Sequence, residues 1–185
     1  GQEEARQANN HSTAHDAQVI AFAMYAGNMK VAREVINAIP RKRLFTQIEP
    51  DGKQPHELRR TLAFGYSQFN LSHFIDIFMM ARKIGISIDN ATSEDGRSFY
   101  KAMDFLVPYV GKDVKAWPYQ QISEWKYKQQ EFCKDLYRTF LLNPERKDYL
   151  KLYKTHRIID WKDRFNLLWM EADDVDLSLI HISEP

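Results

Sequence analysis

The chain has 185 residues, of which 44% are hydrophobic and 13% aromatic, enough to build one domain with a substantial core. Its 26 basic residues nearly cancel its 25 acidic ones and leave a formal net charge of +1. This balance excludes a strong overall attraction to nucleic acid or to an anionic membrane surface. A strongly anionic ligand would therefore need a local basic site.

The single cysteine, Cys133, excludes an intramolecular disulfide and a thiolate metal cluster. No apolar run approaches the roughly 20 residues that span a bilayer. The polar start Gly1-Gln2-Glu3-Glu4 lacks the basic and apolar regions of a signal peptide. Because the first residue is not methionine, we interpret it as an internal point of a longer protein, and the compartment stays open.

Helical periodicity dominates the first part of the chain. One apolar stripe predicts a helix from Ala14 to Tyr25, and a second helix is predicted from Met29 to Ile39, before a proline. Between Arg41 and Pro55 we expect a loop, with a short extended piece at residues 43–48 and a turn at Pro50-Asp51-Gly52.

The later elements are also helical. A long helix is predicted from Pro55 to about Ile84, with a break or kink permitted at Gly65. After a loop in which Ser93 or Asp95 caps the next element, we predict helices over residues 97–110, 121–142, 143–156 and 161–170. About seven helices and almost no strand indicate an all-α fold of antiparallel helix hairpins, arranged as a solenoid or as a closed toroid.

Polar residues gather in two otherwise apolar regions. Asn9-Asn10-His11-Ser12, taken alone, is typical of a helix N-terminus. Arg60 and Tyr66 are six residues apart, so on one straight helix they would lie roughly 120° out of phase. They converge only if the helix breaks between them, which Gly65 permits.

These residues resemble the alginate lyase superfamily of polysaccharide lyases. The likeness consists of Asn9-Asn10-His11-Ser12, Glu57-Leu58-x-Arg60-Thr61 and Tyr66, with flanking similarity at residues 16–28 and at Trp117-Pro118-Tyr119-Gln120-Gln121-Ile122. It covers about residues 8–170. The resemblance implies an (α/α) toroid, of which residues 1–172 would be the C-terminal part. Residues 173–185 look like translated vector sequence, or alternatively a frayed natural terminus.

The resemblance also implies an activity, cleavage of a uronic-acid polysaccharide of alginate or glucuronan type by β-elimination. It implies catalytic roles for Asn10, His11, Arg60 and Tyr66. Arg59 is an alternative to Arg60 as the catalytic arginine. It implies substrate binding by the side chains of Asn9, Arg59, His15, Gln18, Trp117 and Tyr119. It implies no cofactor, no metal and a periplasmic or secreted location.

The residue types suit that reaction. β-Elimination requires neutralisation of the uronate carboxylate, and Asn10 and Arg60 supply an amide donor and a charged, bidentate donor. A base must take the C5 proton and an acid must reach the leaving oxygen. A free phenol, with a reference pKa of about 10, is a poor base at neutral pH, but a nearby cation favours the phenolate. Either Tyr66 serves as both base and acid, or His11 is the base and Tyr66 the acid.

The rival interpretation is a non-catalytic helical module that binds glycans or a protein through aromatic side chains. Tryptophan and tyrosine side chains such as those of Trp117 and Tyr119 more often lie in a protein core than stack on sugars. His56, His73 and His156 are too scattered in the sequence to indicate a metal site.

Overall fold

A computed structural model gives the fold and describes residue 3, residues 7–158 and residues 162–169. Within this part of the chain the structure is helical and no strand is formed, as predicted. The α-helices are α1 (Asn10–Tyr25), α2 (Met29–Ile39), α3 (Phe45–Gln47), α4 (Pro55–Leu58), α5 (Ala63–Lys83), α6 (Phe99–Leu106), α7 (Trp125–Leu142), α8 (Lys147–His156) and α9 (Arg164–Trp169). The described part of the chain also contains one π-helix and two 3₁₀ turns, namely η2 (Pro40–Leu44), η3 (Val107–Tyr109) and η4 (Val114–Ala116).

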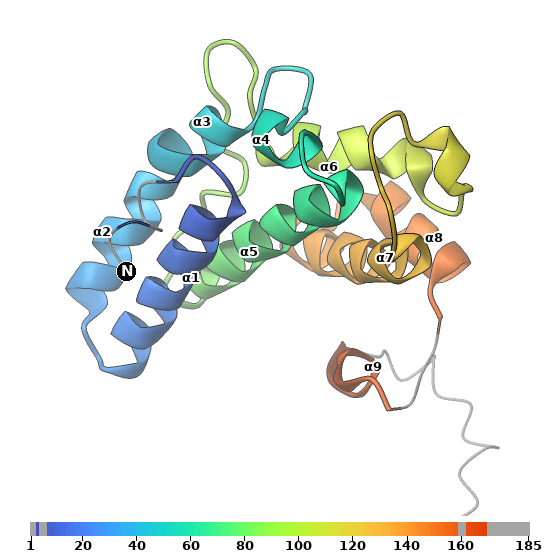
Figure 1. Cartoon of the computed structure of the whole chain (residues 1–185). Helices are drawn as coiled ribbons and strands as arrows, with labels where there is room; N and C mark the ends of the chain where they lie inside the picture. The colour runs from blue at the N-terminus through green and yellow to red at the C-terminus, as the bar shows by residue number, and fades with distance from the viewer. Residues whose placement is uncertain (1–2, 4–6, 159–161, 170–185) are drawn as a thin grey trace, which may run out of the picture.

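The helices form antiparallel hairpins, α1 with α2 and α7 with α8, and α6 returns along α5 (Figure 1). Helices α1, α5 and α7 run side by side in one direction. The parallel course of α5 and α7 follows from the pairs Phe64–Phe132 and Gln68–Asp135, in which both partners advance together along the chain. The tight turn between α1 and α2 uses Gly27, whose φ of +72° is in the left-handed region that glycine tolerates.

The predicted bounds of α2 agree with the structure, whereas α1 begins four residues earlier than predicted, at Asn10. The extended piece predicted at residues 43–48 is wrong, because η2 and α3 occupy most of it. Helix α2 ends before Pro40 as predicted, but the chain stays helical beyond it, since a proline needs no N–H at the start of a helical segment and Pro40 opens η2. The turn at Pro50-Asp51-Gly52 is confirmed, with Gly52 at φ +87°.

The predicted helix from Pro55 to Ile84 is two helices, α4 and α5. The chain breaks at residues 59–62, while Gly65 lies inside α5. Helices α6, α7 and α8 each begin two to four residues later than predicted, and the N-cap of α6 is Ser98, whose hydroxyl accepts from the Lys101 N–H. Ser93 instead accepts from the Arg97 N–H in the loop before it.

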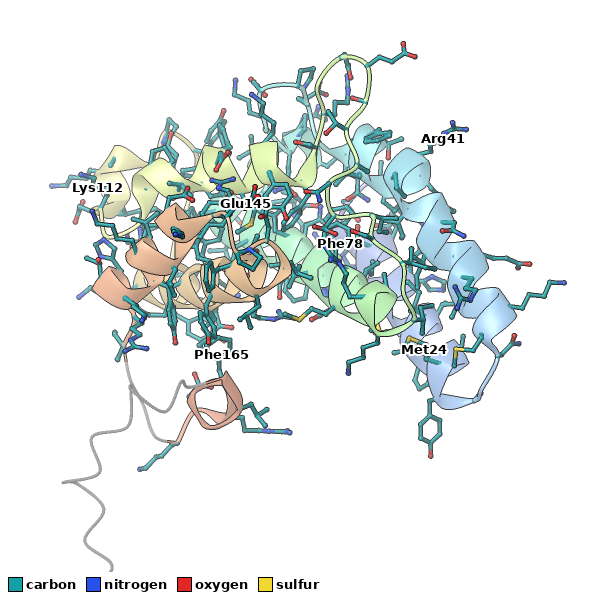
Figure 2. All side chains as sticks on the ribbon, turned by 180° about the vertical axis from the view of Figure 1, so that it is seen from behind. Met24, Arg41, Phe78, Lys112, Glu145 and Phe165 are labelled. Carbon is teal, nitrogen blue, oxygen red and sulfur yellow. The ribbon has the colours of Figure 1, made fainter. Side chains whose placement is uncertain are left out.

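Helix α5 is the centre of the core. Its buried face carries Phe64, Phe74 and Phe78, and the last two contact Phe99 of α6. In Figure 2, Phe78 lies inside the bundle. Figure 2 also labels Phe165 of α9, whose ring contacts those of Tyr137 and Tyr153. Aromatic contacts therefore join α5 to α6, and α9 to α7 and α8.

The predicted tail at residues 173–185 and the predicted last-helix ends, Trp161 and Met170, lie outside the described residues. The division at residue 172 therefore stays a prediction. Among the helices that the structure describes, none is both long enough and apolar enough to cross a bilayer.

Candidate active site

The Asn-Asn-His motif forms the first turn of α1. Asn9 is the N-cap, and its side-chain oxygen accepts from the His11 N–H at 3.1 Å. The motif was expected to precede the helix, but Asn10, His11 and Ser12 belong to it. Successive residues of one turn face different sides, so Asn10 is directed inward and His11 outward into solvent.

Asn10 forms two hydrogen bonds with Glu57 of α4. Its backbone N–H donates to Glu57 Oε1 and its amide Nδ2 to Oε2, both at 2.7 Å. The two side chains are 3% and 1% exposed, respectively. Burial raises the pKa of the Glu57 carboxyl, against the hydrogen bonds from Asn10 and the positive charge of Arg60. Glu57 belongs to the motif, but the sequence alone predicted no role for it. The local indication is an acidic residue beside an otherwise basic cluster.

Arg60 and Tyr66 meet because of the break between α4 and α5. The guanidinium carbon of Arg60 lies 3.9 Å from the centroid of the Tyr66 ring. The convergence predicted for this pair is confirmed, but the hinge at Gly65 is wrong, because the chain turns before Ala63 instead. Arg59, the alternative arginine, is exposed at the end of α4.

A buried polar network holds the start of α1 against α5. Gln47 donates to the Asn9 carbonyl at 3.2 Å and to Ser12 Oγ at 3.1 Å. Its own oxygen accepts from Thr13 at 3.0 Å and from Asn70 at 2.9 Å. Because buried polar groups are costly to leave unpaired, this network fixes the Asn-Asn-His turn relative to the helix that carries Tyr66.

A segment from far along the chain caps the start of α5. The Gln120 carbonyl accepts from the Ala63 N–H at 3.0 Å, and Gln121 Oε1 accepts from the Phe64 N–H at 3.0 Å. The Ile122 N–H in turn donates to the Thr61 carbonyl at 3.1 Å. The part of the Trp117–Ile122 motif nearest α7 therefore satisfies the free N–H groups of the helix on which Tyr66 lies.

The exposed faces of α1 and α5 flank a groove of about 440 Å³. Ala14, Gln18 and Ala21 line it from α1, and His73 and Asp76 are among the residues that line it from α5. His11 lies one turn before Ala14 on the same face of α1. His15 is half-buried beside Asp16, with its Nδ1 3.5 Å from Asp16 Oδ1. Of the predicted binding residues, Gln18 therefore lines the groove, about two helical turns after the motif.

Trp117 and Tyr119 do not join the predicted constellation. Trp117 is 5% exposed and packs edge-on against Phe64 and Tyr109, with Tyr119 at 5.2 Å between ring centroids. A covered indole has no free face for a sugar, so the binding role implied for Trp117 is not supported and its place is in the core. Tyr119 is half-buried in the same aromatic cluster.

A second pocket, of about 260 Å³, adjoins Tyr66 where α5 meets α7. It is lined by Leu62, Gly65, Tyr66, Phe69, Glu124 and Lys128. Among the residues that the structure describes, no group of three or more His, Cys, Asp or Glu side chains is arranged to hold a metal ion. Burial raises the pKa of the Cys133 thiol to about 12.

Comparison with known proteins places the chain in a family. The family model described as "Alginate lyase" matches residues 1–117. A crystal structure of an alginate lyase from Bacteroides ovatus superposes with a TM-score of 0.87 at 47% sequence identity. The alignment covers 91% of this chain and 44% of the other, so this chain spans less than half the length of that protein. No curated protein matches. The superposition agrees with the predicted fold, an incomplete (α/α) toroid of helix hairpins, and the chain belongs to the alginate lyase family.

Proposed function

We propose that this chain provides the proton-transfer part of a polysaccharide lyase that cleaves a uronic-acid-containing polysaccharide, of alginate or glucuronan type, by β-elimination. One observation carries the proposal, the guanidinium of Arg60 stacked 3.9 Å from the centroid of the Tyr66 ring. Membership of the alginate lyase family supports the reaction class. In this reaction the C5–H and C4–O bonds break and a C4=C5 double bond forms. The C5 proton passes to a base, and the departing oxygen receives a proton.

Arg60 and Asn10 are the proposed partners of the substrate carboxylate. A guanidinium stacked on a ring keeps its N–H donors at its edge, where a carboxylate can accept two of them. Asn10 uses one Nδ2 hydrogen on Glu57 and retains another. Glu57 would therefore act as a positioning residue that fixes the Asn10 amide. Neutralising the carboxylate stabilises the charge that develops as C5 loses its proton.

Tyr66 is the proposed proton carrier, with His11 as the alternative base. Tyr66 is half-buried, and the guanidinium of Arg60 lies over its ring. His11 is exposed on the face of α1 that borders the groove. Both assignments leave Tyr66 as the acid that protonates the leaving oxygen, so the Tyr66 hydroxyl is required in either case.

The direct test is to incubate the chain with polymannuronate, polyguluronate and glucuronan and to follow the absorbance of the unsaturated uronate product. We expect product from at least one polymer with the wild type and formation of that product at least about 10²-fold slower with Tyr66→Phe. Glycan binding that persists in both forms without turnover in either would instead establish the non-catalytic binding module. We further propose a periplasmic or secreted location, which fractionation of the source cells tests.

A further inference from the structure

The pocket beside Tyr66 has a chemical character of its own. Leu62, Gly65, Tyr66 and Phe69 form one wall from α5 and the residue before it, and Glu124 and Lys128 form the other from the start of α7. Phe69 is 42% exposed, so part of its ring is open to solvent beside the pocket. Arg60 is not among the residues that line this pocket, so Lys128 supplies its positive charge.

Lys128 is held across the pocket by its aliphatic stem. A Cβ placed on Gly65 would lie 3.1 Å from Lys128 Cγ and 3.3 Å from Cδ and Cε, so the stem passes directly over the glycine. Packing of the stem limits the freedom of the ammonium group before any ligand binds, which lowers the entropic cost of binding.

The ammonium group of Lys128 has no carboxylate partner among the residues that the structure describes. Its Nζ lies 5.1 Å from the centroid of the Tyr127 ring. Glu124 lies one helical turn earlier and lines the same pocket without forming an ion pair with it. A prepositioned cation without an acidic partner, beside an exposed aromatic ring, is suited to a ligand that brings its own negative charge.

We propose that this pocket is a sugar subsite next to the reaction centre, in which Lys128 pairs with the carboxylate of a uronate residue and Phe69 contacts the apolar face of its ring. Glu124 accepts hydrogen bonds from the hydroxyls of the same sugar. The inference rests on the proposed function and extends it, because every residue of a uronate polymer carries a carboxylate. Arg60 pairs with the carboxylate of the sugar that reacts, and Lys128 pairs with the carboxylate of a neighbouring sugar.

The position of Lys128 in the chain makes it independent of the motif. The family model matches residues 1–117, whereas Lys128 and Glu124 lie beyond that match. They reach Tyr66 because residues 120–122 are hydrogen-bonded to residues 61–64. The cation of the proposed subsite therefore lies outside the matched region.

Calorimetric titration with a uronate tetrasaccharide tests the subsite in the wild type, Lys128→Met, Lys128→Arg and the matched control Lys126→Met, which changes an exposed lysine of the same helical turn. We expect Lys128→Met to weaken binding and to raise KM about tenfold with little change in kcat. Lys128→Arg should recover most of the affinity, and Lys126→Met should match the wild type. A carboxyl-reduced tetrasaccharide should bind the wild type and Lys128→Met equally.

Unchanged affinity and KM in Lys128→Met would overturn the subsite while leaving the lyase reaction intact. A wild type that binds the tetrasaccharide through Lys128 but forms no unsaturated product would instead refute the proposed reaction and retain the subsite. The two failures are therefore distinguishable, because binding and turnover are measured on the same proteins.

Discussion

Arg60 and Tyr66 are six residues apart in sequence, yet the guanidinium of the first lies over the ring of the second at 3.9 Å. A continuous helix would separate them by roughly 120° around its axis. The break at residues 59–62 removes that constraint and lets Arg60 fold back onto the first turn of α5. The contact between the two side chains therefore depends on the position at which α4 ends.

Tyr66→Phe should lower kcat by about 10²–10⁴-fold, the usual contribution of a positioned acid or base. The ring and its stacking on Arg60 remain, so the free energy of unfolding should change little. Initial rates on the best uronate polymer measure the effect. Tyr127→Phe, at an exposed tyrosine of α7, is the control and should retain activity. Full activity in Tyr66→Phe would exclude the phenol from proton transfer.

Arg60→Met should reduce kcat/KM by about 10²–10³-fold, because it removes charge stabilisation at the developing carbanion. Arg60→Lys should recover little of this loss, since lysine lacks the planar fork that stacks on a ring and binds a carboxylate at two points. Arg59→Met should stay within a few-fold of the wild type. A larger loss in Arg59→Met than in Arg60→Met would move the catalytic role to Arg59.

Glu57→Gln should destabilise the protein by about 1–3 kcal/mol, because the new amide group presents a donor where the carboxylate accepted one of two hydrogen bonds from Asn10. Urea denaturation measures the free energy of unfolding. Glu145→Gln, at an exposed glutamate, provides the comparison and should be neutral. Equal stability of the two variants would show that Glu57 does not hold the Asn10 turn.

Asp135 should make stability depend on pH. It is buried in α7, accepts from Gln68 Nε2 at 2.7 Å, and burial raises its pKa from 3.8 to about 7. The folded protein therefore keeps a proton that the unfolded chain has lost above about pH 4, so stability falls as the pH rises towards 7. The full shift corresponds to at most about 4 kcal/mol.

Urea denaturation of the wild type and Asp135→Asn at pH 4.5, 6 and 7.5 tests this. The free energy of unfolding of Asp135→Asn should increase relative to that of the wild type as the pH rises. Asp51→Asn is the control, because hydrogen bonding to Lys53 lowers the pKa of Asp51, so its contribution is lost only as the pH falls below about 4. A pH-independent difference between Asp135→Asn and the wild type would contradict the prediction.

Much of the fold was predictable because apolar periodicity reports the buried face of each helix. The limits of α2 and the turn at Gly52 followed from capping and turn residues, and both agree with the structure. The segment at residues 43–48 was mispredicted because its apolar pattern is too short to distinguish helix from strand. Its helical state depends on tertiary contacts such as the pairing of buried Arg43 with Asp16 at 2.8 Å.

The convergence of Arg60 with Tyr66 was predictable, since residues six apart can meet only if the helix breaks between them. The position of the break was not, because the N–H groups that begin α5 are satisfied by Gln120 and Gln121, nearly sixty residues later. Glu57 and Lys128 were missed for a similar reason. Their partners, Asn10 and Gly65, are distant in sequence and no local pattern links them.

The dependence of the first turn of α5 on residues 120–122 has a consequence for the order of folding. Local helical contacts form early, whereas contacts between distant parts of a chain must first overcome the entropy of closing a long loop. During synthesis α5 emerges well before the segment that caps it. The turn that bears Tyr66 is therefore completed late, and variants that weaken the segment at residues 120–122 should slow the appearance of the site more than the formation of the helices around it.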